Sequence, residues 1–199
     1  MKQPIETKKT KKIIFCGYGM SGKSTILRLV SRGIVPSMGE SFHATIDYER
    51  FQHVLDDVEF TIFDLSGKPA FLERFVEELA EFVFSGVAIL VYVVDSTDKK
   101  DLPLVKKYLD RCVERLAQYS PEAPMFVFQH KIDLVAPNER QVTTRSLKEF
   151  LLANISRVIP YYETSVFDTS LIIAMCAVYQ ALLGYIPNNW LEGKIRLFT

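Results

Sequence analysis

Length, composition and charge restrict the classes of protein to which this chain can belong. Its 199 residues suit one domain with a substantial core, and 24 basic side chains balance 24 acidic ones. A dedicated nucleic-acid-binding protein shows a basic excess on one face, so we expect no nucleic-acid partner. The short basic run within residues 1–10 predicts a flexible, solvated tail.

The sequence also bears on the cellular compartment. The first residues are polar, unlike a secretory signal, and the three cysteines are far apart, without a metal-binding spacing. The most apolar helical segment, residues 171–178, is too short to span a bilayer. We therefore expect a cytoplasmic protein without direct membrane insertion, which a partner would have to recruit to a membrane surface.

Apolar β-rich runs alternate with helical patterns along the chain. The predicted strands are residues 13–16, 45–54, 60–64, 87–95, 124–130 and 158–165. Apolar stripes at helical spacing predict helices over residues 22–31, 70–84, 101–119, 143–155 and 168–183. This alternation predicts an α/β fold, with a mostly parallel six-stranded sheet covered by helices on both faces. The globular domain should run from residue 11 to 185, followed by a C-terminal tail over 186–199.

The first predicted strand leads directly into GYGMSGKS, residues 17–24, which matches G-x-x-x-x-G-K-S. Glycines let such a loop fold around phosphates with its N–H groups inward, and the following helix adds its positive end. Lys23 can reach the terminal phosphates and assist catalysis there, and the Ser24 hydroxyl can bind Mg²⁺. The strand–loop–helix context predicts a phosphate site made by Gly19, Met20, Ser21, Gly22, Lys23, Ser24 and Thr25.

A second motif, DLSG, ends the third predicted strand. Asp64 stands where a metal-side acid is expected and can hold Mg²⁺ through a water, and the Gly67 N–H can meet a γ-phosphate. Lys68 follows directly, at the position where a catalytic residue is expected. The stretch has the composition of a turn, and the phosphate loop gives that turn a predicted role in catalysis.

A third motif, HKID, follows the fifth predicted strand and begins at His130. The carboxylate of Asp133 can accept hydrogen bonds from the ring N–H and exocyclic amine of guanine, a donor pair that adenine lacks. The stem of Lys131 can cover the face of the base. At the end of the next strand, the Ser165 N–H can bind the guanine carbonyl and Thr164 can steady Asp133.

These motifs, together with HATIDYER, YSPEAPMFVFQHKIDLV and YYETSVFDTSL, resemble the Rag/Gtr family of Ras-like GTPases over roughly residues 11–190. Histidine at the start of the guanine motif is characteristic of that family. The resemblance implies a Ras-like P-loop NTPase fold, GTP/GDP and Mg²⁺ as ligands, and Thr45 as the switch I residue that binds Mg²⁺ and senses the γ-phosphate. It also implies switch regions over 32–47 and 64–76, through which effectors and regulators such as a GAP or an exchange factor act.

Two features depart from that family. Its members commonly carry glutamine directly after DxxG, where the amide orients the attacking water. Lys68 has donors only, and Pro69 restricts it to an extended conformation, so we predict very slow intrinsic hydrolysis. The roadblock-type domain through which the family heterodimerises would begin within 186–199, so heterodimerisation is not carried over and we expect a monomer.

Several functions share parts of this motif set. The leading hypothesis is a Mg-dependent GTP/GDP switch that hydrolyses GTP slowly or with assistance from a partner. A hydrolysis-deficient scaffold that holds a guanine nucleotide is the alternative that Lys68 favours. An Arf-like GTPase shares the same core motifs, and an ATP-dependent phosphotransferase shares the phosphate loop.

Overall fold

The fold is built on one six-stranded sheet. This computed structural model describes residues 10–36, 47–56 and 58–198, and its strands are β1 (Thr10–Cys16), β2 (Tyr48–Leu55), β3 (Val58–Leu65), β4 (Val87–Asp95), β5 (Met125–His130) and β6 (Tyr161–Thr164). Their spatial order is β2–β3–β1–β4–β5–β6. Strand β2 runs antiparallel to β3, and every other neighbouring pair is parallel. The predicted mostly parallel six-stranded sheet is confirmed.

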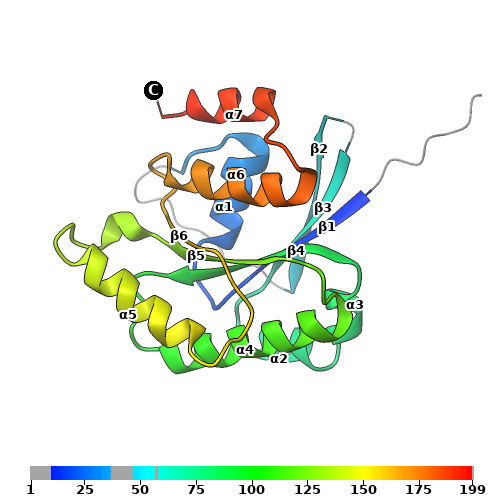
Figure 1. Ribbon diagram of the computed structural model, residues 1–199, viewed down its shortest axis with the longest axis vertical. Helices are drawn as coiled ribbons and strands as arrows, with labels where there is room; N and C mark the ends of the chain where they lie inside the picture. Colours follow the sequence, from blue (N-terminus) through cyan, green and yellow to red (C-terminus); the bar gives the residue numbers. More distant parts are fainter. Residues whose placement is uncertain (1–9, 37–46, 57, 199) are drawn as a thin grey trace, which may run out of the picture.

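Helices cover both faces of this sheet (Figure 1). One face carries α1 (Lys23–Arg32) and α6 (Ser170–Leu183), and α7 (Asn188–Ile195) packs outside them. The other face carries α2 (Pro69–Val76), α3 (Ala80–Phe84), α4 (Leu102–Tyr119) and α5 (Arg140–Leu152). Among residues 10–36, 47–56 and 58–198, none of the helices combines the length and the hydropathy that crossing a bilayer requires.

The burial of the strands follows from this layering. The apolar runs of β4 and β5 are buried almost throughout, because helices cover both sides of the centre of a parallel sheet. Side chains on one face join a hydrophobic cluster with α2 to α5, and those on the other join a cluster with α1, α6 and α7. The edge strand β2 leaves most of its side chains exposed or partly exposed. Because β3, β1, β4, β5 and β6 run parallel, their carboxyl ends lie at the same edge of the sheet.

The predicted helix over residues 70–84 is two helices in the structure. Its first part ends at Val76, and α3 begins at Ala80. Between them the Leu79 N–H donates to the Arg74 carbonyl, five residues back, instead of continuing the four-residue helical pattern. The amphipathic pattern runs through this break, so the local sequence alone did not reveal it.

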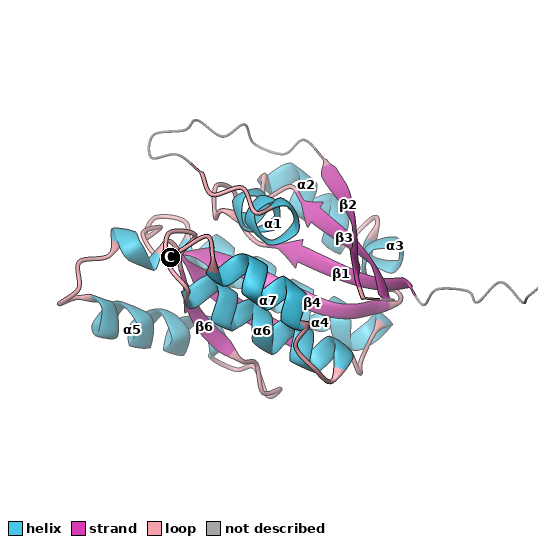
Figure 2. Ribbon diagram, turned by 90° about the horizontal axis from the view of Figure 1, so that it is seen from above, coloured by secondary structure: helices cyan, strands magenta, loops and turns pink. Residues whose placement is uncertain are grey.

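Within the predicted tail over 186–199, residues 188–195 form helix α7. Figure 2 looks down on α7 and on the helices beneath it. The Trp190 indole is buried, with its ring 4.7 Å from that of Tyr179 between centroids and its Nε1 3.4 Å from the Val30 carbonyl. Lys194 Nζ donates to the Leu29 carbonyl at 2.9 Å. The last carbonyls of α1 thus accept hydrogen bonds from α7, and the Leu29 carbonyl accepts a second one from the Gly33 N–H.

Candidate functional site

The phosphate-loop motif lies between β1 and α1, where two of its glycines are required by the backbone. Gly17 has φ 142°, and a Cβ there would lie 2.1 Å from the Val93 carbonyl oxygen of β4. Gly22 has φ 95°, and a Cβ there would lie 2.5 Å from His130 Cδ2. Side chains rarely adopt such φ values, and neither position has space for one. The loop is therefore pressed between the ends of β4 and β5.

Lys23, the first residue of α1, points back into this loop. Its Nζ donates to the carbonyls of Gly17 at 2.9 Å and Tyr18 at 3.0 Å, and lies 3.3 Å from Ser21 Oγ. Burial lowers the Lys23 pKa to about 8, although the nearby Asp64 carboxylate opposes that shift. An ammonium group buried among neutral acceptors is suited to an incoming phosphate, whose charge would stabilise it further.

The structure brings Ser24 and Asp64 together as a pair of oxygen donors. Ser24 Oγ lies 2.5 Å from Asp64 Oδ2, and Asp64 is fully buried at the end of β3. Mg²⁺ prefers oxygen ligands and usually takes only one or two from the protein, with waters and phosphates completing the shell. In the described part of the chain, His, Cys, Asp and Glu do not form clusters of three or more that could hold a metal. The hydroxyl–carboxylate pair could supply oxygen ligands to Mg²⁺.

Gly67 lies directly against the phosphate loop. A Cβ on Gly67 would lie 2.5 Å from the Gly19 nitrogen and 2.5 Å from the Tyr18 carbonyl carbon. In the reverse direction, a Cβ on Gly19 would lie 3.4 Å from the Gly67 carbonyl oxygen. The two predicted phosphate-sensing segments are therefore in backbone contact, and only glycine fits at position 67 without movement.

Lys68 follows Gly67 at the start of α2, and its side chain is exposed. Its backbone is extended, with φ −69° and ψ 137°, as the following Pro69 favours. The Lys68 carbonyl accepts hydrogen bonds from the N–H groups of Phe71 and Leu72 and so begins the helix. The exposed ammonium group has three N–H donors and offers no acceptor for a water molecule.

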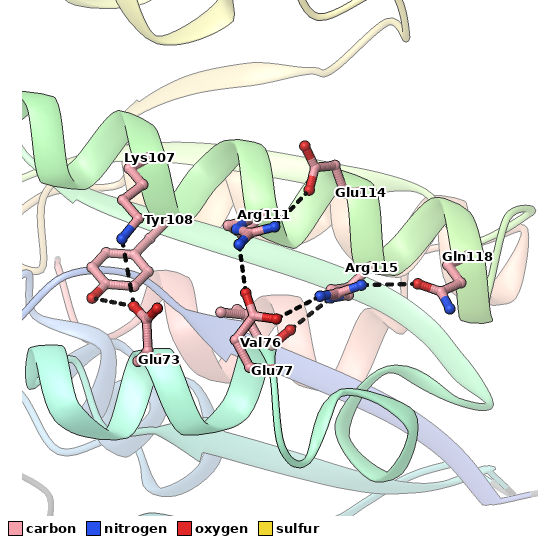
Figure 3. A network of polar contacts seen from close by, with 9 residues as sticks. All are labelled: Glu73, Val76, Glu77, Lys107, Tyr108, Arg111, Glu114, Arg115 and Gln118. Atoms are coloured by element: carbon pink, nitrogen blue, oxygen red, sulfur yellow. Dashed lines mark hydrogen bonds and ion pairs between the residues drawn. The ribbon is translucent and has the colours of Figure 1, made fainter.

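The far end of α2 is fixed to α4 by two arginines (Figure 3). Arg115 Nε donates to the Val76 carbonyl at 2.6 Å, and its Nη2 lies 2.8 Å from Glu77 Oε2. Arg111 Nη2 lies 2.6 Å from the other oxygen of the same carboxylate. Further contacts along the two helices join Glu73 to Lys107 and Tyr108, Arg111 to Glu114, and Arg115 to Gln118. Helix α2 thus contacts α4 along its length, and Gly67, two residues before the helix, contacts the phosphate loop.

His130 stands at the end of β5 and is buried. Its Nδ1 lies 2.9 Å from Thr164 Oγ1 on β6, and its ring contacts the position of Gly22. Burial lowers the His130 pKa to about 4, and the neighbouring Lys131 charge acts in the same direction. The imidazole is therefore neutral at pH 7. Thr164, which we expected to steady Asp133, contacts His130.

Lys131 connects the guanine motif to two other segments. Its Nζ donates to the Met20 carbonyl at 2.6 Å and lies 2.7 Å from Asp95 Oδ2 at the end of β4. The Lys131 backbone is left-handed, with φ 61°, a conformation that non-glycine residues rarely adopt. The side chain therefore runs from β5 across to the phosphate loop, along the region where the motif predicts a base.

The remaining predicted base contacts lie on two neighbouring loops. Asp133 lies in the 3-10 turn η1 (Ile132–Leu134) and is half-buried. Ser165 follows β6 and is buried, and its N–H donates to Ser170 Oγ at 2.9 Å. A guanine carbonyl at that N–H would therefore take the place of the Ser170 hydroxyl. Both loops follow strands whose ends meet at the same edge of the sheet, next to the phosphate loop.

Two further predicted residues are Thr45 and Thr25. Thr45 lies outside the described residues, and so does most of the predicted switch region 32–47. Thr25, predicted to bind the nucleotide, is half-buried in the first turn of α1. Sequence reasoning missed Asp95 as a site residue. Its position could have indicated a role, because Asp95 is an acidic residue at the carboxyl end of a buried parallel strand, where α/β proteins bind ligands.

Comparison with known proteins identifies a family for this chain. A family model described as "Gtr1/RagA G protein conserved region" matches residues 12–197. The chain is 29% identical over 195 residues to "GTP-binding protein gtr1" of Schizosaccharomyces pombe, covering 95% of this chain and 61% of that protein. It is 30% identical over 176 residues to "Ras-related GTP-binding protein B" of Rattus norvegicus, covering 86% of this chain and 45% of that protein. The chain therefore spans about half to three-fifths of the length of these relatives.

Among solved structures, the chain is similar to the Arl6 BBS3 small GTPase of Trypanosoma brucei with a bound GppNp. The TM-score is 0.61 at 21% sequence identity, and the match covers 95% of this chain and 99% of the other. At that identity the likeness extends to the fold, which is that of a small GTPase.

Proposed function

The chain belongs to the Gtr1/RagA family of G proteins, and on this basis we propose that it is a Mg-dependent switch between GTP-bound and GDP-bound states. The observation that carries the proposal is the contact between Gly67 and the phosphate loop at Gly19, where a Cβ on Gly67 would lie 2.5 Å from the Gly19 nitrogen. A γ-phosphate held by the loop would lie next to the Gly67 N–H. The presence of that phosphate would thereby decide where the following segment sits.

The residues of the phosphate loop have separate roles in this proposal. Backbone N–H groups from Gly19 to Thr25 surround the phosphates, and Lys23 exchanges its carbonyl acceptors for phosphate oxygens. Ser24, Thr45 and Asp64 would hold Mg²⁺, the first two as direct ligands and Asp64 through a water. When bound, the metal neutralises charge that develops between the β- and γ-phosphates.

Guanine specificity rests on the loops after β5 and β6. We assign Asp133 to the ring N–H and exocyclic amine of guanine and the Ser165 N–H to its carbonyl. His130 links the loops after β5 and β6 to the phosphate loop, because its ring contacts Thr164 on β6 and the position of Gly22. The aliphatic stem of Lys131 covers the face of the base. ATP offers the opposite donor–acceptor pattern and would bind far more weakly.

The output of the switch is the order of two segments that partners read. Residues 32–47 and 64–76 change with the nucleotide, and effector and regulator proteins dock on them. Helix α2 contacts α4 at its beginning, where Tyr108 Oη donates to the Pro69 carbonyl, and at its end through Arg111 and Arg115, so these contacts would have to change if α2 moved as a unit. A GAP or an exchange factor would act on the same two segments, and a partner would bring the protein to a membrane surface.

The side chain of Lys68 bears on whether this protein hydrolyses GTP, the point on which two versions of the proposal differ. The side chain is exposed and positively charged, so it can attract a γ-phosphate but cannot orient a water as an amide does. The first version is an enzyme that hydrolyses GTP very slowly or with a group supplied by a partner. The second candidate is a scaffold that retains guanine nucleotide without hydrolysing it, and the donor-only side chain of Lys68 is the observation that favours it.

Nucleotide identity tests the switch proposal itself. Purified protein should carry guanine nucleotide through purification, and GTP but not ATP should displace a fluorescent GDP analogue in the presence of Mg²⁺. Chelation of Mg²⁺ should accelerate nucleotide release. Displacement by ATP at the same concentration as GTP would contradict the assignment of Asp133.

Phosphate release tests the role of Lys68. We expect the Lys68→Gln variant to release phosphate from GTP faster than the wild type, because an amide can both donate to and accept from the attacking water. Equal rates would show that Lys68 does not limit hydrolysis, and another residue would then position the water. Complete absence of phosphate release from the wild type over hours, with GTP still bound, would favour the scaffold. Light scattering after size exclusion tests the expected monomer in the same samples.

A further inference from the structure

We propose that Asp95 is a positioning residue that holds Lys131 across the nucleotide site and thereby slows nucleotide release. The inference rests on the proposed function, because it assumes that a guanine base lies beneath the Lys131 stem. Asp95 ends β4 and belongs to none of the three nucleotide motifs. It faces the site from a strand that separates the phosphate loop from the guanine motif.

The two oxygens of the Asp95 carboxylate have different partners. Oδ1 accepts hydrogen bonds from the Thr97 N–H at 2.8 Å and from Thr97 Oγ1 at 2.7 Å. Oδ2 lies 2.7 Å from Lys131 Nζ. The Thr97 contacts fix the orientation of the Asp95 carboxylate. The Asp95 side chain therefore loses little further rotamer freedom when Oδ2 binds Lys131. The local turn therefore orients Asp95 for a long-range contact.

Lys131 in turn bridges two segments. Its Nζ contacts Asp95 on one side and the Met20 carbonyl of the phosphate loop on the other. These two acceptors, from different segments, hold the ammonium at the end of a long flexible stem. Without the carboxylate, the ammonium would retain one carbonyl acceptor and the stem would regain rotamer freedom. A stem held at its tip covers a flat base more effectively than a mobile one.

The end of β4 also holds the backbone that carries Lys131. Asp95 lies opposite His130 in the parallel pairing of β4 with β5. The adjacent Ser96 donates to the His130 carbonyl twice, from its N–H at 2.9 Å and from its Oγ at 2.7 Å. These contacts secure the peptide that precedes the left-handed backbone of Lys131. The short segment 95–97 therefore supports both the main chain and the side chain of Lys131.

The charge on Asp95 is maintained in this setting. Burial by itself raises the Asp95 pKa, but hydrogen bonds from Lys131 and Thr97 outweigh that effect and keep the pKa below its ordinary value. The Asp95 side chain is 13% exposed and that of Lys131 28% exposed, so solvent screens the pair only in part. A charge-assisted bond at such a site is stronger than a surface ion pair.

Nucleotide release measures this role directly. Full-length protein is loaded with a fluorescent GDP analogue and chased with excess GDP, with Mg²⁺ present throughout. We expect Asp95→Asn to release the analogue about tenfold faster than the wild type, the factor that corresponds to one hydrogen bond to a charged group. The matched control is Asp110→Asn, which removes the carboxylate that pairs with Lys106 on α4, away from the site. Its release rate should equal that of the wild type.

A second background separates positioning from general support of the fold. Lys131→Met keeps a stem of similar length and removes the ammonium, so it should itself speed release. In that background Asp95→Asn should change the rate by less than about twofold, because the contact it removes is already lost. An equally large additional effect in the Lys131→Met background would overturn the proposal, and so would a wild-type release rate in either single variant. If Asp95→Asn fails to fold, a wild-type release rate from Lys131→Met would still overturn the proposal.

The outcome for the wild type distinguishes this inference from the function on which it rests. Failure of the wild type to bind the GDP analogue would contradict the proposed function. Tight binding by the wild type together with unchanged release from Asp95→Asn would contradict only the role of Asp95.

Discussion

His130 and Gly22 are in such close contact that a methyl group added to the glycine would lie 2.5 Å from the imidazole Cδ2 and 3.0 Å from Nε2. The ring cannot move away freely, because its Nδ1 lies 2.9 Å from Thr164 Oγ1. The guanine motif and the phosphate loop thus constrain each other through a histidine at the end of β5. Nothing in the linear sequence places these two residues side by side.

Gly22→Ala is expected to destabilise the protein by about 2–4 kcal/mol. The change adds left-handed strain at φ 95° and a steric clash with a buried ring. Gly86→Ala is the matched control, because Gly86 also has a positive φ, 65°, but a Cβ there would have nothing within 4 Å. Urea unfolding of both variants separates the clash from the strain. Equal losses of stability would show that the His130 contact contributes little.

His130 should also make stability depend on pH. Its pKa of about 4 in the folded protein lies below its ordinary value of 6.5. Above pH 6.5 neither state binds the proton; as pH falls towards 4, the unfolded chain binds it and the folded chain does not. Stability is therefore lost on acidification, by a limit of about 3 kcal/mol. His130→Asn should have a shallower decline between pH 6.5 and 4 and a parallel curve above pH 7, measured by urea unfolding. Identical slopes in the acid range would refute this assignment.

Gly67→Ala should separate the two nucleotide states. A Cβ would lie 2.5 Å from the Gly19 nitrogen, so residue 67 must retreat from the loop and its N–H would no longer meet a γ-phosphate. We expect affinity for a non-hydrolysable GTP analogue to fall about tenfold, with GDP affinity nearly unchanged. Gly193→Ala on α7, where a Cβ would have nothing within 4 Å, serves as control in the same titrations. A parallel loss of affinity for both nucleotides would argue against a γ-phosphate contact.

Trp190 tests whether α7 belongs to the folded domain. The side chain is 6% exposed and contacts Tyr179 and the end of α1. Trp190→Ala should lower the free energy of unfolding by about 3–5 kcal/mol, the usual loss for a buried tryptophan. Ile195→Ala on the same helix, at a side chain 42% exposed, should change it by less than about 0.5 kcal/mol. If denaturant unfolding gave the same small loss of unfolding free energy for both variants, α7 would contribute little to the stability of the domain.

The sheet could be predicted from the sequence because its central strands are long apolar runs. Such a run, for example residues 87–95, indicates a strand even when the neighbouring strands are unknown. The break between α2 and α3 was missed because Arg115, which lies far along the chain, donates to the Val76 carbonyl at the end of α2. Helix α7 was missed because its few apolar residues become a core only when α1 and α6 lie beneath them.

The same distinction applies to the candidate site. The phosphate loop, DLSG and HKID are contiguous motifs, so the sequence predicts their residues by spacing alone. The contacts of Thr164 with His130 and of Asp95 with Lys131 depend on which strands are neighbours. Strand order is a property of the whole fold, and a motif does not contain it. The residues that support a motif are therefore harder to predict than the residues within it.

The attachment of α7 to α1 has a consequence for sequence comparison. Lys194 and Trp190 both donate to backbone carbonyls, those of Leu29 and Val30. Every amino acid at positions 29 and 30 supplies the same carbonyl acceptor, so a substitution there does not require a compensating change at 190 or 194. Pairwise covariation between the two helices would consequently not register these hydrogen bonds, although they join the carboxyl end of α1 to a helix more than 150 positions further along the chain.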